Sequence, residues 1–202
     1  MKRSERREKS TAAILEAAFA EFGERGYAGA TVDGGCERGG ISKGMMYHYY
    51  SGKDDLFCAC VERMFSALGE RLGQYLDGGG DISAQELLSG FFMCRERFFE
   101  ETPNMRAVFE DAMLRTPPQL SDEISRLRTP VKESNRELLN SMLRQSNLRE
   151  SVSEAEARRW FDAIDVVLPE LFARFTNGLN GGLEEQIRSV LNMLLFGIFK
   201  CS

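Results

Sequence analysis

Residues 31–50 read TVDGGCERGGISKGMMYHYY, and this stretch decides the fold of the N-terminal part of the chain. Thr31 and Ser42 each precede a helical pattern, at the position where a hydroxyl oxygen accepts a hydrogen bond from the first helical turn. Gly39 and Gly40 lie between the two patterns, where consecutive glycines favour a break in the chain. The stretch therefore predicts two short helices joined by a tight turn.

An amphipathic helix precedes this stretch. Ile14, Ala18 and Phe22 recur at the i, i+4, i+8 spacing of one helix face, and Gly26 ends the pattern. Two short helices packed on a preceding helix are the parts of a helix-turn-helix, whose second helix enters the DNA major groove. That helix needs small or polar residues in its first turn so that its backbone can approach base edges and phosphates. The residues that meet this need are Ser42, Lys43 and Gly44, followed by Tyr47, His48 and Tyr49.

The rest of the chain also has helical periodicity, so the predicted fold class is all-α. No segment alternates in the way that a strand does, and no internal repeat is evident. The expected helices lie at 53–76, 83–101, 104–115, 119–147, 153–178 and 183–200, with Pro130 splitting or kinking the one at 119–147.

Charge is distributed unevenly along the 202 residues, whose formal net charge is −5. Residues 1–53 hold nine Lys and Arg against seven Asp and Glu, whereas residues 54–202 hold 17 against 24. Residues 1–53 thus form a cationic head and residues 54–202 an anionic body. This difference suggests that the head binds a polyanion and that the body does not. A solvated basic tail is the alternative explanation.

The composition argues against many classes of enzyme. His48 is the single histidine, and no nucleophile–base pair, paired carboxylates or cofactor loop stands out, so we expect no enzyme, no cofactor and no metal site. The five cysteines are scattered, which favours reduced cytosolic thiols. No run approaches the roughly 18 apolar residues of a membrane span. Acidic residues interrupt the basic N-terminus, so we expect no signal peptide, no membrane partner and a cytoplasmic location.

Two runs, ILEAAFAEFGERGYAGATV at 14–32 and CERGGISKGMMYHYYSGKDDLF at 36–57, closely resemble the N-terminal domain of the tetracycline-repressor (TetR) family of bacterial transcription regulators. The shared features are the apolar first helix, the Phe-x-x-x-Gly-Tyr sequence at its end, and a Thr at the next helix cap. Gly-Ile-Ser-Lys-Gly, an aromatic cluster and Lys-x-x-Leu at the start of the fourth helix follow in order. The resemblance spans about a quarter of the chain. It implies a helix-turn-helix DNA-binding domain at 1–53 and a helical effector-binding and dimerisation domain at 54–202.

The resemblance also implies which residues contact DNA. Lys43 would donate to guanine O6 and N7, Met45 would pack on a thymine methyl group, and Tyr47 would contact a phosphate. Lys53 would anchor the DNA backbone from a helix N-terminus. The full implied set is Arg6, Arg7, Thr31, Ser42, Lys43, Gly44, Met45, Tyr47, His48, Tyr49 and Lys53.

One pair of residues departs from the family pattern. Gly35 stands where the family usually has a large apolar side chain, so we expect it to face the core of a helix at 31–38 and leave space there. We expect Gly34 to lie on the solvent side of the same helix.

The body is rich in phenylalanine and methionine, most of which must form its core. An adaptable apolar pocket is also possible in such a bundle, and it would bind a small apolar or aromatic effector. The candidate ligand residues are Phe91, Cys94, Phe98, Phe109 and Met113. The carboxylates of Glu96, Glu100, Glu110 and Asp111 would favour a lipophilic cation, or are simply exposed on the surface.

The last two expected helices carry broad apolar faces, which generally mark interfaces. In the TetR family this helix pair builds a two-fold, four-helix homodimer interface. The interface residues predicted here are Leu168, Leu171, Phe172, Phe175, Val190, Leu194 and Ile198.

Together these observations predict a ligand-responsive, homodimeric DNA-binding regulator that represses transcription. A small effector would release it from a pseudo-palindromic, double-stranded operator. Activation in place of repression remains open, and so do two alternatives to a regulator of this kind. One is an effector-binding interaction protein whose DNA-binding head is weakened by Gly34 and Gly35, and the other is a small all-α enzyme.

Overall fold

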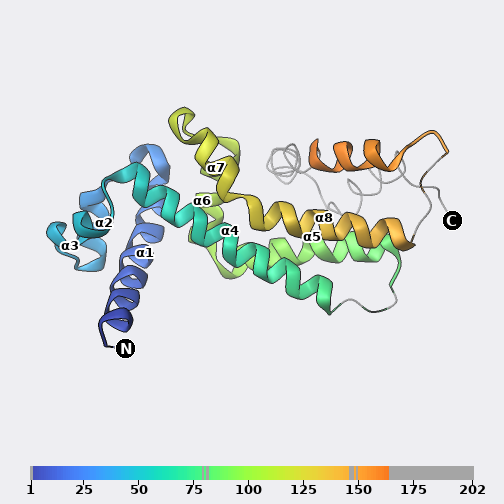
Figure 1. The fold of residues 1–202 in the computed structure, drawn as a ribbon. Helices are drawn as coiled ribbons and strands as arrows, with labels where there is room; N and C mark the ends of the chain where they lie inside the picture. Colours follow the sequence, from blue (N-terminus) through green and yellow to red (C-terminus); the bar gives the residue numbers. More distant parts are fainter. Residues whose placement is uncertain (1, 79, 81, 146–147, 149, 164–202) are drawn as a thin grey trace, which may run out of the picture. The chain divides into compact units, whose positions relative to one another are not determined.

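The computed structural model describes residues 2–78, 80, 82–145, 148 and 150–163, and every regular element in this part of the chain is a helix (Figure 1). The elements are α1 (Lys2–Gly29), α2 (Val32–Gly39), α3 (Lys43–Tyr49), α4 (Lys53–Asp77), α5 (Ala84–Glu101), α6 (Pro103–Leu114), the 3-10 helix η1 (Pro118–Leu120), α7 (Ser121–Leu127) and α8 (Thr129–Gln145), followed by a helical segment at 154–163. The predicted all-α fold class is confirmed.

Backbone contacts divide the chain into two compact units. Unit 1 joins the residues up to Ser66 with Phe99–Arg128, and unit 2 joins Ala67–Phe98 with the residues from Thr129 onward. The units follow chain packing rather than function, so the functional boundary at residue 53 stays a prediction.

Helix α1 follows the apolar stripe seen in the sequence. Ile14 and Ala18 are fully buried, and Phe22 is 2% exposed. At Gly26 the backbone leaves the helical region, with φ +64° and ψ 171°. A residue with a side chain adopts such a positive φ only at a cost, so glycine is the residue suited to this interruption. The predicted end of the helical pattern at Gly26 is confirmed.

The turn between α2 and α3 is built from local hydrogen bonds. The N–H of Gly34 donates to Thr31 Oγ1 at 2.9 Å, and the N–H of Met45 donates to Ser42 Oγ at 3.2 Å. Both predicted N-caps are therefore present. Gly40, with φ +59°, ends α2, and its N–H and that of the next residue return to carbonyls of the last α2 turn. This is a Schellman arrangement, which satisfies carbonyl groups that the helix end would leave unpaired.

The core of unit 1 brings α1, α2, α3 and α6 together with the first half of α4. Helix α1 packs on both α2 and α6. The fully buried ring of Phe57 meets the edges of Phe22 and Tyr27, with ring centroids 5.1 and 4.8 Å apart. Met46, also fully buried, anchors α3 in the same unit.

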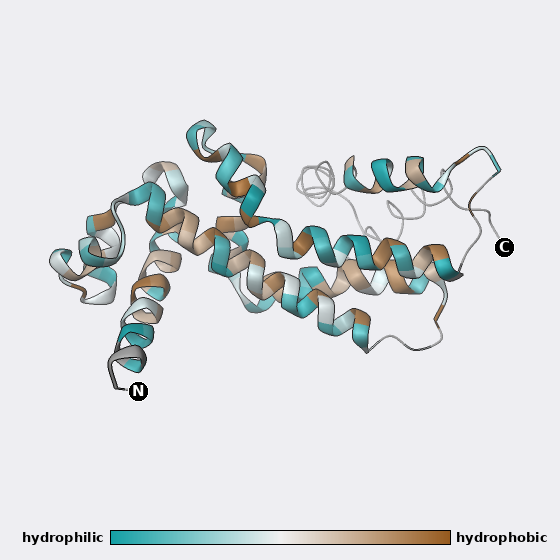
Figure 2. Ribbon diagram, viewed as in Figure 1, coloured by the Kyte–Doolittle hydropathy of each residue, from teal (hydrophilic) through white to brown (hydrophobic). Residues whose placement is uncertain are grey.

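The core of unit 2 includes apolar side chains of α4, α5 and α8. Figure 2 shows hydrophilic and hydrophobic residues in alternating bands along α5 and α8, as in amphipathic helices. Helices α4 and α8 approach closely at Gly69, because a Cβ atom there would lie 2.7 Å from the Cβ of Pro130. The buried hydroxyl of Ser134 donates to the carbonyl oxygen of Gly69 at 3.2 Å across the same contact.

The helix expected at 119–147 is divided in the structure, as Pro130 predicted. Helix α7 ends at Leu127, and α8 begins at Thr129 with Pro130 in its first turn, where a missing N–H breaks no helical hydrogen bond. The seven predicted interface residues lie outside the described residues. They are Leu168, Leu171, Phe172, Phe175, Val190, Leu194 and Ile198.

The cysteines of the described chain carry free thiols. Cys36 and Cys60 are buried, and burial raises the pKa of both. Burial and nearby carboxylates raise the pKa of Cys58 to about 11. Since the neutral thiol is a poor nucleophile, these three side chains are suited to packing rather than to reaction.

Candidate nucleic-acid interface

The exposed surface of α3 is polar at its start and aromatic further along. Ser42, Lys43 and Gly44 are all exposed, and the Tyr47 side chain is 54% exposed. Met46 is fully buried beneath them. This division holds α3 in unit 1 through one face and leaves the opposite face accessible, as a helix that enters a major groove requires.

Lys43 is paired with a carboxylate of the preceding helix. Its Nζ donates to Asp33 Oδ2 at 2.7 Å, and both side chains are more than half exposed. This hydrogen bond raises the pKa of Lys43, so its ammonium group is charged at neutral pH. Solvent screens the exposed ion pair and weakens it, and the contact of Lys43 with a guanine edge stays a prediction.

The remaining predicted contacts of α3 differ in exposure. His48 is exposed, and its ring meets the edge of the Tyr49 ring with centroids 5.1 Å apart. Tyr49 and Met45 are half-buried. The structure therefore brings Ser42, Lys43, Gly44, Tyr47 and His48 to the accessible surface, with Met45 and Tyr49 at its margin.

The other predicted contacts lie on α1, at the start of α2 and at the start of α4. Arg7 is exposed, whereas the side chain of Arg6 lies outside the described residues. Thr31 is exposed, although its hydroxyl already accepts the capping hydrogen bond of α2. The Lys53 ammonium group donates to the Tyr27 carbonyl oxygen at 2.8 Å and lies 4.5 Å from the Tyr27 ring centroid. Lys53 therefore hydrogen-bonds to the C-terminal end of α1, and its contact with DNA stays a prediction.

A buried carboxylate that the sequence analysis missed supports α2 from below. Glu21 of α1 is 2% exposed, and it accepts hydrogen bonds from the Thr31 N–H at 3.2 Å and from Arg38 Nε at 2.7 Å. Burial alone would raise the pKa of Glu21, but the bonds from Arg38 and Thr31 outweigh burial and lower it. The signal was present in the sequence, since residue 21 falls on the inward face with Ile14 and Ala18.

The two glycines of α2 have different neighbours, and one expectation about them is wrong. Gly34 does not face solvent, because a Cβ atom there would lie 2.6 Å from the Glu21 carboxyl carbon. Its missing side chain makes room for the buried carboxylate. Gly35 is buried, as predicted, and its nearest neighbour to a Cβ atom would be the Met46 methyl group at 3.8 Å. Of the two positions, Gly35 is therefore the one with space for a small side chain.

A polar cluster, formed by Tyr27, Asp54, Asp111, Arg115 and Gln119, joins four segments of unit 1. The Tyr27 N–H donates to Asp111 Oδ2 at 2.6 Å, and the Tyr27 hydroxyl donates to Asp54 Oδ1 at 2.5 Å. Gln119 Nε2 donates to the Tyr27 hydroxyl oxygen at 2.8 Å, and Arg115 Nε donates to Asp111 Oδ1 at 2.7 Å. Burial and Asp54 raise the pKa of Tyr27 to about 12. This cluster orients the end of α1 against α4, α6 and η1.

The predicted ligand residues fall in both units. Phe109 and Met113 belong to unit 1, where the Phe109 ring packs against the Phe99 ring with centroids 4.8 Å apart. Phe91, Cys94 and Phe98 belong to unit 2, and the two phenylalanines are 2% and 7% exposed. Of the five, only Cys94 lines the cavity that the described chain contains between α4 and α5. The other four are buried or partly buried, and their contact with a ligand stays a prediction.

The described residues contain no candidate for a membrane span, because none of their helices combines the necessary length and apolarity. They also contain no group of three His, Cys, Asp or Glu side chains placed to hold a metal ion.

Comparison with a family model finds a similarity in the same N-terminal segment. The family described as bacterial regulatory proteins, tetR family, matches residues 14–60. The HTH-type transcriptional regulator BetI from Stenotrophomonas maltophilia (strain R551-3) is 32% identical over 74 residues. That match covers 37% of this chain and 38% of the relative, so the similarity spans less than half of the relative's length.

Solved structures are similar over nearly the whole chain. The transcriptional regulator FadR from Bacillus subtilis, in complex with stearoyl-CoA, has a TM-score of 0.73 at 17% identity, covering 93% of this chain and 98% of its own. The TetR-family regulator PfmR from Thermus thermophilus has a TM-score of 0.61 at 22% identity, covering 90% and 96%. At these identities the likeness shows a shared fold.

Proposed function

We propose that this chain, whose residues 14–60 match the tetR family of bacterial regulatory proteins, is a ligand-responsive, DNA-binding transcription regulator of that family. The observation that carries the proposal is the accessible face of α3. Ser42, Lys43 and Gly44 begin that face, while the buried Met46 holds the helix in place. A short helix held in this way presents its first turn to base edges and phosphates.

We propose further that the regulator is a homodimeric repressor. Two copies of α3 would enter successive major grooves of a pseudo-palindromic operator, about 34–36 Å apart. The sequence supports dimerisation through the apolar residues around Leu168 and Leu194. Two heads held at a fixed separation bind two half-sites far more tightly than one head does, because the second contact becomes intramolecular.

Regulation would follow from effector binding in the helical body. A small molecule that prefers a conformation with differently spaced heads shifts the population away from the DNA-bound state. The sequence predicts an apolar or aromatic effector. In the polar cluster, Tyr27 connects the end of α1 to Asp111 of α6, so a displacement of α6 would be transmitted to the head.

An electrophoretic mobility shift with DNA from upstream of the chain's own gene tests the proposal. We expect a retarded complex and an altered base preference in each half-site for Lys43→Ala, because a bidentate contact to guanine discriminates by about 1–3 kcal/mol. Arg136→Ala is the control, since Arg136 is an exposed cation of α8 in unit 2. An unchanged base preference in Lys43→Ala would contradict the role of α3.

The alternative of an interaction protein with a weakened head rested on Gly34 and Gly35. The structure gives this alternative little support, because the Glu21 carboxylate uses the space at Gly34 and α2 is capped at both ends. Failure of the wild-type chain to retard any upstream DNA would favour the alternative.

A further inference from the structure

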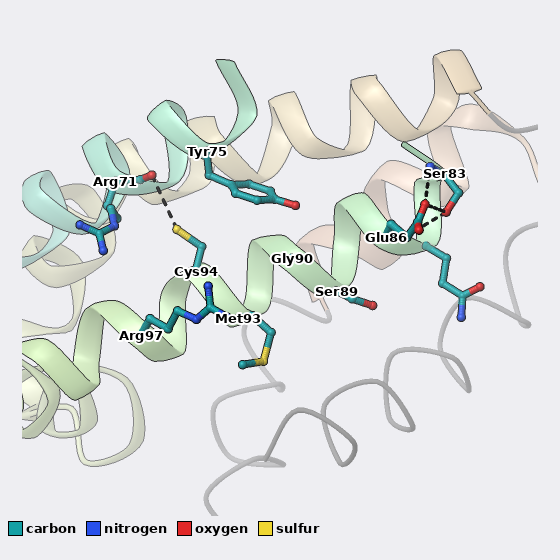
Figure 3. A pocket seen from close by; sticks show the side chains of 10 residues that line it. Arg71, Tyr75, Ser83, Glu86, Ser89, Gly90, Met93, Cys94 and Arg97 are labelled. Carbon is teal, nitrogen blue, oxygen red and sulfur yellow. Dashed lines mark hydrogen bonds between the residues drawn. The ribbon is translucent and has the colours of Figure 1, made fainter. Parts of the chain in front are cut away.

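A cavity of about 690 Å³ lies between α4 and α5, within unit 2 (Figure 3). This volume falls within the range of roughly 300–1,000 Å³ that is typical of small-molecule sites. Arg71 and Tyr75 stand one turn apart on α4. Gly90, Cys94 and Arg97 follow the i, i+4, i+7 spacing of one face of α5. Two helix faces thus supply most of the lining residues that the structure describes.

The wall formed by Tyr75 is held in place by packing. The Tyr75 ring lies against Gly90, where a Cβ atom would be 2.8 Å from the ring carbon Cζ. The Tyr75 hydroxyl donates to the Leu87 carbonyl oxygen at 3.3 Å, and burial raises its pKa, so the phenol is neutral. The Cys94 thiol donates to the Arg71 carbonyl oxygen at 3.8 Å. The cavity therefore has one preformed wall that joins the two helices.

The described part of the lining has a net positive charge, although the sequence from residue 54 onward is acidic. Arg71 and Arg97 are the cations of the described lining, and Figure 3 places both at the same end of the cavity. Glu86 is the one acidic residue among the described residues that line it, and its carboxylate accepts hydrogen bonds from the N–H and the hydroxyl of Ser83 at 2.9 and 2.7 Å. That carboxylate caps the start of α5 at the other end of the cavity.

We propose that this cavity binds an amphipathic organic anion. The oxyanion group would accept hydrogen bonds from Arg71 and Arg97, and the apolar part would lie along Tyr75, Met93 and Cys94. Guanidinium groups are suited to this role because their planar N–H donors match carboxylate and phosphate oxygens. This inference rests on the proposed function, because it gives the charge class of the effector proposed there.

The lipophilic cation considered from the sequence would need the opposite charge. It relied on four carboxylates, and none of the four lines the cavity of the described chain. Two of them, Glu96 and Asp111, are buried rather than exposed.

Calorimetric titration of the full chain without DNA tests the inference with four probes that share a ten-carbon tail. Decanoate and decyl phosphate carry the two kinds of oxyanion, decanol is neutral, and decyltrimethylammonium is cationic. We expect saturable binding of at least one anion, at least about tenfold tighter than decanol, and no binding of the cation. The affinity of the anion should fall as salt is added.

Three substitutions locate the binding. Arg97→Gln and Arg71→Gln should each lower the affinity for the anion roughly tenfold or more. Arg63→Gln, at an exposed arginine of α4 that does not line the cavity, should leave binding unchanged. Since Arg97 is exposed, its variant is expected to fold even if Arg71→Gln does not.

The outcomes separate this inference from the proposed function. Binding of neither anion, equal binding of decanol, or full affinity in Arg97→Gln would overturn the anion site. Anion binding that leaves an operator complex intact would contradict effector regulation, while the site itself would stand.

Discussion

Replacing Gly34 by alanine should destabilise the protein, whereas the same substitution at Gly35 should stabilise it. The two glycines are neighbours in α2, so the intrinsic preference of alanine for a helix favours both substitutions equally. They differ in what a Cβ atom would meet. At Gly34 it would lie 2.6 Å from the Glu21 carboxyl carbon, and at Gly35 the nearest atom is the Met46 methyl carbon at 3.8 Å.

The magnitudes follow from these two environments. Alanine is favoured over glycine in a helix by about 1 kcal/mol, and burying one methyl group adds about 0.8 kcal/mol at Gly35. At Gly34 the new methyl group displaces the Glu21 carboxylate from the Thr31 N–H and weakens its bond to Arg38. Hydrogen bonds to a charged group contribute about 1.5–3 kcal/mol each, so the net loss is about 1–3 kcal/mol. The two variants should differ by about 3–5 kcal/mol.

Thermal and urea-induced unfolding of both variants provides the measurement. A difference of about 3–5 kcal/mol corresponds to roughly 6–20 °C in Tm for a chain of this length. The same substitution in a Glu21→Ala background is the control, because without the carboxylate Gly34→Ala should become stabilising. If Gly34→Ala raises the stability of the native chain as Gly35→Ala does, the contact with Glu21 does not limit this position and the reasoning fails.

Three further predictions concern other parts of the molecule. Gly69→Ala should lower the free energy of unfolding by about 1–3 kcal/mol in urea titrations, because a Cβ atom would lie 2.7 Å from the Pro130 Cβ. Gly73→Ala should raise the free energy of unfolding by about 1 kcal/mol, because a Cβ atom there would meet nothing within 4 Å in the described chain. Effects of the same sign would refute the close approach at Gly69. The folded pKa of Tyr27 is raised from 10.0 to about 12, so its stabilising contribution is complete below pH 10 and is lost as the pH rises toward 12. Tyr27→Phe should therefore flatten the decline in stability over this range, and an unchanged slope would argue against the raised pKa. Leu194→Glu should give monomers on gel filtration and lose operator affinity, and a monomeric wild-type chain at micromolar concentration would contradict the predicted interface.

The fold could be predicted well where its signals are local. The caps at Thr31 and Ser42 and the chain reversal at Gly40 are made by groups within five residues of one another. The split at Pro130 follows from the missing N–H of proline itself. Such features do not depend on the rest of the fold, so they can be recognised before the fold is known.

The candidate site was predicted less completely, because exposure and partners depend on packing. The exposed start of α3 followed from the motif. The expectation that Gly34 lies on the solvent side was wrong, because the helical pattern of α2 does not show that the Glu21 carboxylate of α1 lies against it. Phe91 and Phe98 were predicted as ligand residues from their spacing, and both side chains are buried in the structure. Spacing cannot distinguish a core position from a cavity wall, so their contact with a ligand stays a prediction.

The sequence by itself therefore determined the helical class, the position of the two short helices at 31–50 and the residues that cap them, because these depend on hydrogen bonds and periodicity within a few residues. Only the tertiary structure decided which polar groups meet. Glu21 and Arg38 are 17 residues apart, and the Tyr27 N–H and Asp111 are 84 residues apart. Periodicity shows that such a residue faces inward, but its partner comes from another helix, and packing alone selects that helix.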